Sequence, residues 1–205
     1  MNPKIIFQKI ICNSKDIQGQ RAVACGWLFN LTGKRVKHSK SGRPIIGRTM
    51  DVSISHKNNL AYIGIAPRPY RIGVDVEHIK NDINTELFLK WVITKKETLF
   101  LRTFCKKGRL SLSSGIAVFW SVKEAFFKCL DYDLKPGKIS ILNISKNNRI
   151  KINYSDEIKR LMRKKKLKFC FARTIFNKKH IYSEAIMRMV ALKKLSTDRY
   201  SKQKI

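Results

Sequence analysis

The stretch FWSVKEAFFKCL, residues 119 to 130, is predicted to form a helix that decides how the rest of the chain folds. At about 100° of rotation per residue, large apolar side chains surround most of this helix: Phe119, Trp120, Val122, Phe126, Phe127, Cys129 and Leu130. A helix that is apolar on most sides is buried. Only Ser121, Glu124 and Lys128 share a narrow polar seam, and Lys123 falls in an apolar sector.

Charges on a buried helix require a partner, because an unpaired buried charge is strongly destabilising. One interpretation is a simple ion pair between Glu124 and Lys128, which are four residues apart. The other is that the seam faces a binding site that compensates the charges.

A second acidic feature favours the binding site. RIGVDVEHI, residues 71 to 79, is predicted to be a strand, and the alternation of its side chains places Asp75 and Glu77 on the same face. Their backbone positions are then about 7 Å apart. Like charges this close raise each other's pKa unless a cation lies between them. The pair therefore predicts a metal ion or a basic partner, unless it is a coincidental surface pair.

The composition is that of a globular protein: 205 residues, 43% hydrophobic and 10% aromatic. The formal charge of +30 favours acidic partners such as nucleic acid, anionic membrane, a phosphorylated ligand or an acidic protein. An equally weighted alternative is that the charge reflects a generally lysine-rich composition without a function. Five cysteines without a CxxC spacing argue against a zinc site or a disulfide framework. No apolar stretch is long enough to span a membrane, and the N-terminus is not a convincing signal peptide, so a cytoplasmic protein is expected.

The chain is predicted to be α+β, with an order of strand, helix, strand, strand that occurs twice. Three adjacent strands are expected at 50–55, 60–66 and 71–79, and a hairpin at 168–176 and 180–190. Helices are expected at 21–31, at 84–105 and at 155–165. The first has Ala22, Cys25, Leu28 and Phe29 on one side, and the second carries Thr94 and Glu97 in capping-box spacing. The predicted units are an N-terminal half at 1–90, a C-terminal half at 91–192 and a frayed basic tail at 193–205.

Three motifs follow one another in the chain: SISH at 53–56, GVDVE at 73–77 and FWSVKEAFFK at 119–128, with Gly42-Arg43-Pro44 upstream. Together they resemble the 4′-phosphopantetheinyl transferases of the surfactin-synthetase-activating type, over roughly residues 20 to 140. The resemblance implies two pseudo-equivalent halves, each a small sheet packed with helices, with the active site in the cleft between them. It also implies a monomer that transfers the phosphopantetheine arm of coenzyme A to a serine of an acidic apo carrier protein, releasing adenosine 3′,5′-bisphosphate.

The resemblance assigns roles residue by residue. Mg²⁺ would be bound by Asp75, Glu77 and Glu124, with Glu124 and Lys128 also catalytic. Coenzyme A would be bound by Arg21, Arg43, Ser55, His56, Lys123 and Lys128, with Lys34, Arg35, Lys37 and Lys40 as further candidates for its 3′-phosphate. The chain departs from the family pattern at Asp51 to Ser53, where an aromatic residue and an asparagine are usual.

Two other functions stay open. The charge of +30 is also compatible with a nucleic-acid-binding protein. However, the sequence contains no motif of a known nucleic-acid-binding domain, and specific nucleic-acid binding is not expected. A degenerate transferase fold retained as a binding partner is the second alternative. The motifs do not discriminate between acyl, aryl and peptidyl carriers.

Overall fold

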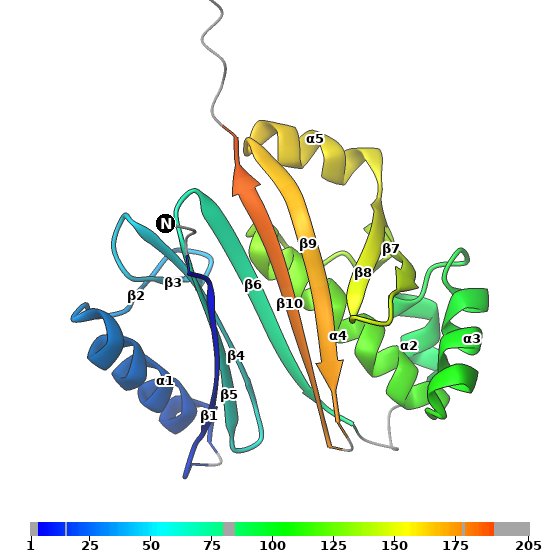
Figure 1. The fold of residues 1–205 in the computed structure, drawn as a ribbon, viewed down its shortest axis with the longest axis horizontal. Helices are drawn as coiled ribbons and strands as arrows, with labels where there is room; N and C mark the ends of the chain where they lie inside the picture. Colours follow the sequence, from blue (N-terminus) through cyan, green and yellow to red (C-terminus); the bar gives the residue numbers. More distant parts are fainter. Residues whose placement is uncertain (1–3, 15, 80–84, 178, 191–205) are drawn as a thin grey trace, which may run out of the picture.

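The computed structural model describes residues 4–14, 16–79, 85–177 and 179–190, so the predicted tail at 193–205 lies outside the described residues. The fold is α+β, as predicted, and contains two main antiparallel sheets (Figure 1). Among the described helices, none is both long and apolar enough to cross a membrane.

The first sheet has three strands in the order β1-β5-β4: β1 (Ile6–Ile11), β5 (Leu60–Pro67) and β4 (Met50–Lys57). Helix α1 (Ile17–Thr32) packs on it, and β2 (Lys37–His38) and β3 (Pro44–Ile45) form a small hairpin nearby. Of the four residues predicted on one side of α1, Leu28 is confirmed as buried and Cys25 is partly buried, whereas Ala22 and Phe29 are exposed. Ala24 and Leu28 are buried in this helix, whereas Phe29 is 46% exposed.

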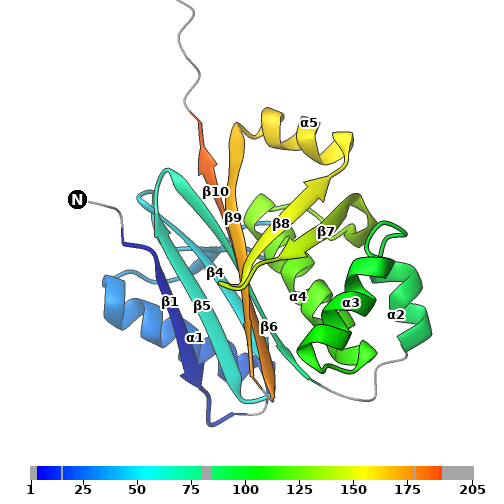
Figure 2. The same ribbon diagram turned by 45° about the vertical axis from the view of Figure 1, so that its right-hand side comes forward.

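The second sheet has five strands in the order β6-β10-β9-β8-β7: β6 (Tyr70–His78), β10 (His180–Met189), β9 (Leu167–Phe176), β8 (Arg149–Tyr154) and β7 (Ile139–Ile144). The predicted hairpin of β9 and β10 is confirmed. The other elements of this part are α2 (Thr85–Val92), α3 (Thr98–Gly108), α4 (Leu112–Leu130), η1 (Pro136–Lys138) and α5 (Asp156–Lys164). Helix α4 lies along one face of the five-stranded sheet (Figure 2).

Strand β6 was expected to continue the sheet of β4 and β5, but it pairs with β10 instead. It still lies beside β4, and polar side chains of β4 join the two strands. The backbone N–H of Ile72 donates to Asp51 at 2.8 Å, and that of Val74 donates to Ser53 Oγ at 3.1 Å. This arrangement gives the atypical Asp51 and Ser53 a structural role and aligns β4 with the acidic strand.

The interior position of α4 agrees with the sequence prediction, since its apolar residues are buried almost all round. Its N-terminus is capped by Ser111, whose hydroxyl accepts the N–H of Ser114 at 3.1 Å. The single helix expected at 84–105 is divided into α2 and α3. Glu97 accepts the N–H of Thr94 at 2.7 Å, as capping-box spacing predicts, but this turn precedes α3.

Candidate active site

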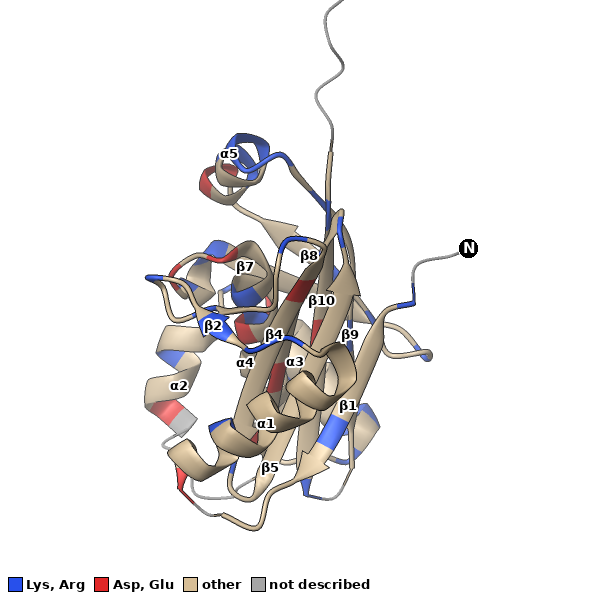
Figure 3. Cartoon of the chain, turned by 90° about the vertical axis from the view of Figure 1, so that its left-hand side faces the viewer, with Lys and Arg blue, Asp and Glu red and all other residues tan. Residues whose placement is uncertain are grey.

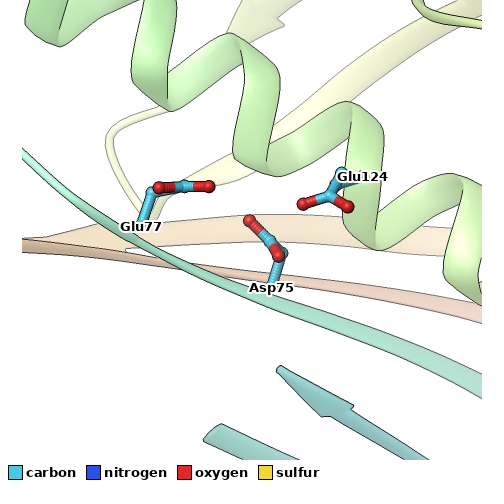
Figure 4. A group of neighbouring side chains, drawn as sticks. All are labelled: Asp75, Glu77 and Glu124. Carbon is cyan, nitrogen blue, oxygen red and sulfur yellow. The ribbon is translucent and has the colours of Figure 1, made fainter. Parts of the chain in front are cut away.

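Asp75, Glu77 and Glu124 come together between β6 and α4. Asp75 and Glu77 point from the same face of the strand, and Glu124 points toward them from the helix (Figure 4). One carboxylate oxygen of each residue lies within 4.8 Å of those of the other two. The polar seam of α4 therefore faces the acidic pair of β6.

A glycine sets the distance between the strand and the helix. A Cβ atom on Gly73 would lie 1.9 Å from the carbonyl oxygen of Ala125 and 2.4 Å from the nitrogen of Cys129, both backbone atoms of α4. No other residue permits so close an approach. Gly73 thus allows Asp75, two residues further along the strand, to lie next to Glu124.

Two lysines partly neutralise the cluster. The ammonium of Lys128 lies 2.7 Å from Oδ1 of Asp75 and 3.8 Å from Oε2 of Glu124. It also donates to Ser55 Oγ at 3.1 Å, and this hydroxyl donates to Asp75 at 2.8 Å. On the other side, Lys57 Nζ lies 2.6 Å from Oε2 of Glu77.

The electrostatic balance differs between the acids. Burial, together with the nearby charge of Asp75, raises the pKa of Glu124 to about 8. Burial also opposes ionisation of Asp75, but the ammonium of Lys128 and several hydrogen bonds outweigh it and lower the pKa of Asp75. Conversely, the two acids raise the pKa of Lys128 despite its burial. The site thus holds Asp75 and Lys128 as an ion pair, whereas the pKa of Glu124 lies near neutral pH.

The cluster fits a divalent cation. Asp75 is 1% exposed, and with all three acids ionised its Oδ2 has no hydrogen-bond donor among the described residues. Carboxylate oxygens are the ligands that Mg²⁺ prefers, and a cation here would satisfy this buried oxygen. Asp75, Glu77 and Glu124 are therefore the residues that could hold a metal ion.

A pocket of about 420 Å³ adjoins the cluster, and Glu124 and Lys128 form part of its wall. Gly42 and Arg43 line it from the loop between β2 and β3, Pro44 lines it from the start of β3, and Phe127 and Tyr132 provide aromatic surface. The pocket is large enough for part of a nucleotide-sized ligand.

Arg43 lies in this pocket wall, but its guanidinium already holds three elements together. It donates to the carboxylate of Asp51, to the carbonyl of Ile72 at 2.9 Å and to the carbonyl of Lys128. Only 10% of its side chain is exposed. The structure thus brings Arg43 to the site as a clamp between β4, β6 and the end of α4.

Ser55 and His56 are neighbours whose side chains take opposite sides of β4, because strand side chains alternate. Ser55 joins the carboxylate cluster, whereas His56 lies on the side of α1. Burial, with the nearby charges of Arg21 and Lys128, lowers the pKa of His56 to about 4. Its Nε2 is buried and accepts no hydrogen bond among the described residues.

The remaining basic candidates are not gathered at the cluster. Arg21 is exposed on α1, and four of the five lysines and arginines between α1 and β3 are also exposed: Lys34, Arg35, Lys37 and Lys40. Lys37 lies on β2, and Figure 3 shows basic residues in blue near this strand.

The structure contradicts the expectation that Lys123 contacts coenzyme A. Its side chain has no exposed surface, and its ammonium donates to Glu97 at 2.8 Å, to the carbonyl of Val92 at 2.6 Å and to that of Pro136 at 3.1 Å. These acceptors use all three of its hydrogens. Lys123 is a core residue, and its position in an apolar sector of α4 was the signal of that role.

A comparison with protein families identifies the superfamily of the chain. The sequence profile of the 4′-phosphopantetheinyl transferase superfamily matches residues 71–181, which include β6 and α4. The match covers more than half of the chain, and the protein belongs to this superfamily. No curated protein sequence matches the chain.

Solved structures of holo-ACP synthases resemble the chain at a lower level. That of Plasmodium yoelii has 19% identity and a TM-score of 0.48, and covers 60% of this chain and 100% of its own. The complex of the Chronobacterium ammoniagenes enzyme with CoA has 14% identity and a TM-score of 0.47, with the same coverage. At these TM-scores the likeness adds nothing to the assignment.

Proposed function

We propose that this protein is a Mg²⁺-dependent 4′-phosphopantetheinyl transferase of the surfactin-synthetase-activating type. It transfers the phosphopantetheine arm of coenzyme A to a serine hydroxyl of an apo carrier protein and releases adenosine 3′,5′-bisphosphate. The observation that carries the proposal is the cluster of Asp75, Glu77 and Glu124 with Lys128, at the edge of a pocket of about 420 Å³.

The three carboxylates would hold Mg²⁺ next to the pyrophosphate of coenzyme A. When bound, this ion would neutralise the pyrophosphate and the charge that develops on the leaving phosphate. The donor set supports this, since it consists of hard oxygens and includes Oδ2 of Asp75, which has no donor among the described residues when all three acids are ionised.

Two side chains of the protein would contact the phosphate and accept the proton of the serine. Lys128, whose pKa is raised, stays cationic and is suited to contact a phosphate oxygen. Glu124 lies in the pocket wall beside Lys128 and, once ionised, would accept the proton of the attacking serine, directly or through water.

Coenzyme A would lie along the pocket and the cluster. Arg43 lines the pocket and would supply positive charge even though its guanidinium is bonded to the protein, and Ser55 would act through its hydrogen bonds with Asp75 and Lys128. His56 and Arg21 lie on the other side of β4, toward α1, and would contact a part of coenzyme A that extends past this strand. The exposed basic residues from Lys34 to Lys40 are the candidates for the 3′-phosphate.

The acceptor would be an acidic carrier protein, whether acyl, aryl or peptidyl. A net charge of +30 would attract such a partner and speed the encounter at low salt. The enzyme would act as a cytoplasmic monomer, without specific nucleic-acid binding.

The test is intact-mass spectrometry of several apo carriers incubated with the protein, coenzyme A and Mg²⁺. The expected result is a gain of one phosphopantetheinyl group that disappears with EDTA. If no carrier gains mass, calorimetry with coenzyme A separates two explanations: binding indicates that the true carrier was not among those tested, and absence of binding indicates an inactive transferase fold. Absence of both, together with salt-sensitive binding to DNA or RNA, would favour the nucleic-acid-binding alternative.

A further inference from the structure

Lys57 occupies a position at the carboxylate cluster that the motifs did not single out. It is the last residue of β4, and its side chain lies on the same side of the strand as Ser53 and Ser55. Each of these three residues contacts β6: Ser53 contacts Val74, Ser55 contacts Asp75 and Lys57 contacts Glu77. The ion pair of Lys57 is thus part of the alignment between two strands.

The two lysines of the cluster differ in how firmly they are held. Lys128 has two carboxylates and a hydroxyl as partners and is anchored in a buried helix. Among the described residues, Lys57 forms an ion pair with Glu77 alone, and its side chain is 36% exposed. Its ammonium can therefore move into solvent with little loss of stability, because exposed ion pairs contribute little.

The charges explain why it would move. Three ionised carboxylates carry three negative charges, and Lys128 together with a divalent cation balances them completely. Lys57 is then surplus, and it competes with the cation for Oε2 of Glu77. An ammonium held by an oxygen occupies the place that a metal ion would take.

We propose that Lys57 is an internal competitor for the divalent cation. It neutralises Glu77 while the cation is absent and leaves Glu77 when the cation binds, so that it weakens the affinity of the site for the metal. The released ammonium stays near the mouth of the site, where it is available to an anionic ligand. This inference rests on the proposed function only in taking the three carboxylates as cation ligands.

The test measures binding of Mn²⁺ to the full chain without coenzyme A or carrier, from the electron paramagnetic resonance signal of free Mn²⁺, with Mg²⁺ as competitor. Lys57→Met should tighten binding by about three- to tenfold. Lys57→Arg keeps the positive charge and should bind Mn²⁺ within about twofold of the unaltered protein.

The matched control is Lys90→Met. Lys90 also forms an ion pair with a glutamate, Glu86, at 2.9 Å, but it lies on α2 and outside the cluster. The variant removes the same charge from the molecule. Its Mn²⁺ affinity should be unchanged if the effect of Lys57→Met comes from the cluster and not from the change in net charge. Equal affinities of Lys57→Met and Lys90→Met, weaker binding by Lys57→Met, or no Mn²⁺ binding by any form would each overturn the inference.

Thermal denaturation gives a second readout. Without Mn²⁺, Lys57→Met should melt below the unaltered protein, because Glu77 loses its counter-ion. Saturating Mn²⁺ should raise the Tm of this variant more than that of the unaltered protein. An equal rise in Tm for both would contradict the competition. These measurements are independent of transfer: Lys57-dependent Mn²⁺ binding without any transfer would overturn the proposed function alone.

Discussion

Lys123 and Glu97 form an ion pair of 2.8 Å in the core, where neither side chain has any exposed surface. Glu97 also accepts the backbone N–H groups of Thr94 and Ile141, each at 2.7 Å. The pair therefore joins α4 to the turn before α3 and to β7. This network lies one residue along the helix from Glu124 and fixes the helix that carries it.

Lys123→Met should destabilise the protein without weakening its affinity for coenzyme A. Removal of one partner of a buried pair leaves an uncompensated charge and costs about 3–5 kcal/mol. Urea denaturation gives the free energy of unfolding, and calorimetry under conditions where the variant is folded gives the affinity.

The double variant Lys123→Met with Glu97→Leu is the control for this prediction. It removes both charges and should be less destabilised than the single variant. A loss of coenzyme A affinity in a fully folded Lys123→Met protein would instead return Lys123 to the binding site.

Gly73→Ala should separate β6 from α4 and disable the site. The new Cβ atom would collide with backbone atoms of Ala125 and Cys129, which cannot move aside as a flexible side chain would. Overpacking of this kind costs about 1–3 kcal/mol, and the shift would increase the distance between Asp75 and Glu124. Lower stability and weaker Mn²⁺ binding are both expected.

Gly26→Ala serves as the matched control. Gly26 lies in α1, where a Cβ atom would meet no atom within 4 Å. Alanine in a helix is more stable than glycine by about 1 kcal/mol, so this variant should be slightly stabilised and bind Mn²⁺ normally. Normal Mn²⁺ binding by a folded Gly73→Ala protein would show that the close approach is dispensable.

Glu124→Gln should reduce phosphopantetheinyl transfer by about 10²–10⁴-fold, the usual contribution of a general acid or base. The amide retains the shape of the side chain but can neither accept the serine proton nor provide a charged ligand oxygen. Single-turnover mass spectrometry measures the rate, and circular dichroism checks the fold. Full activity in Glu124→Gln or in Asp75→Ala would refute the assignment of the acidic cluster.

The local pattern of the sequence predicted the site better than the pairing of its strands. Strand alternation correctly placed Asp75 and Glu77 on one face, and helical periodicity correctly turned Glu124 and Lys128 toward them. These are properties of single elements. The pairing of β6 with β10 joins segments about 100 residues apart, and no local pattern specifies such a contact. For the same reason, a helical wheel shows that Lys123 is buried but cannot identify Glu97 as its partner.

Stability should fall with decreasing pH through His56. The pKa of His56 is about 4 in the folded protein, compared with 6.5 for a histidine that is not buried. The unfolded chain therefore binds a proton at a higher pH than the folded one. The neutral form therefore contributes stability that is complete above pH 6.5 and is lost as the pH falls toward 4.

Titration of the imidazole proton resonances by NMR should find this histidine still neutral at pH 5. In urea denaturation, His56→Gln should lose part of the dependence of stability on pH over this range, whereas the same change at exposed His38 should retain it. An ordinary titration of His56 near pH 6.5 would contradict its burial in a neutral form.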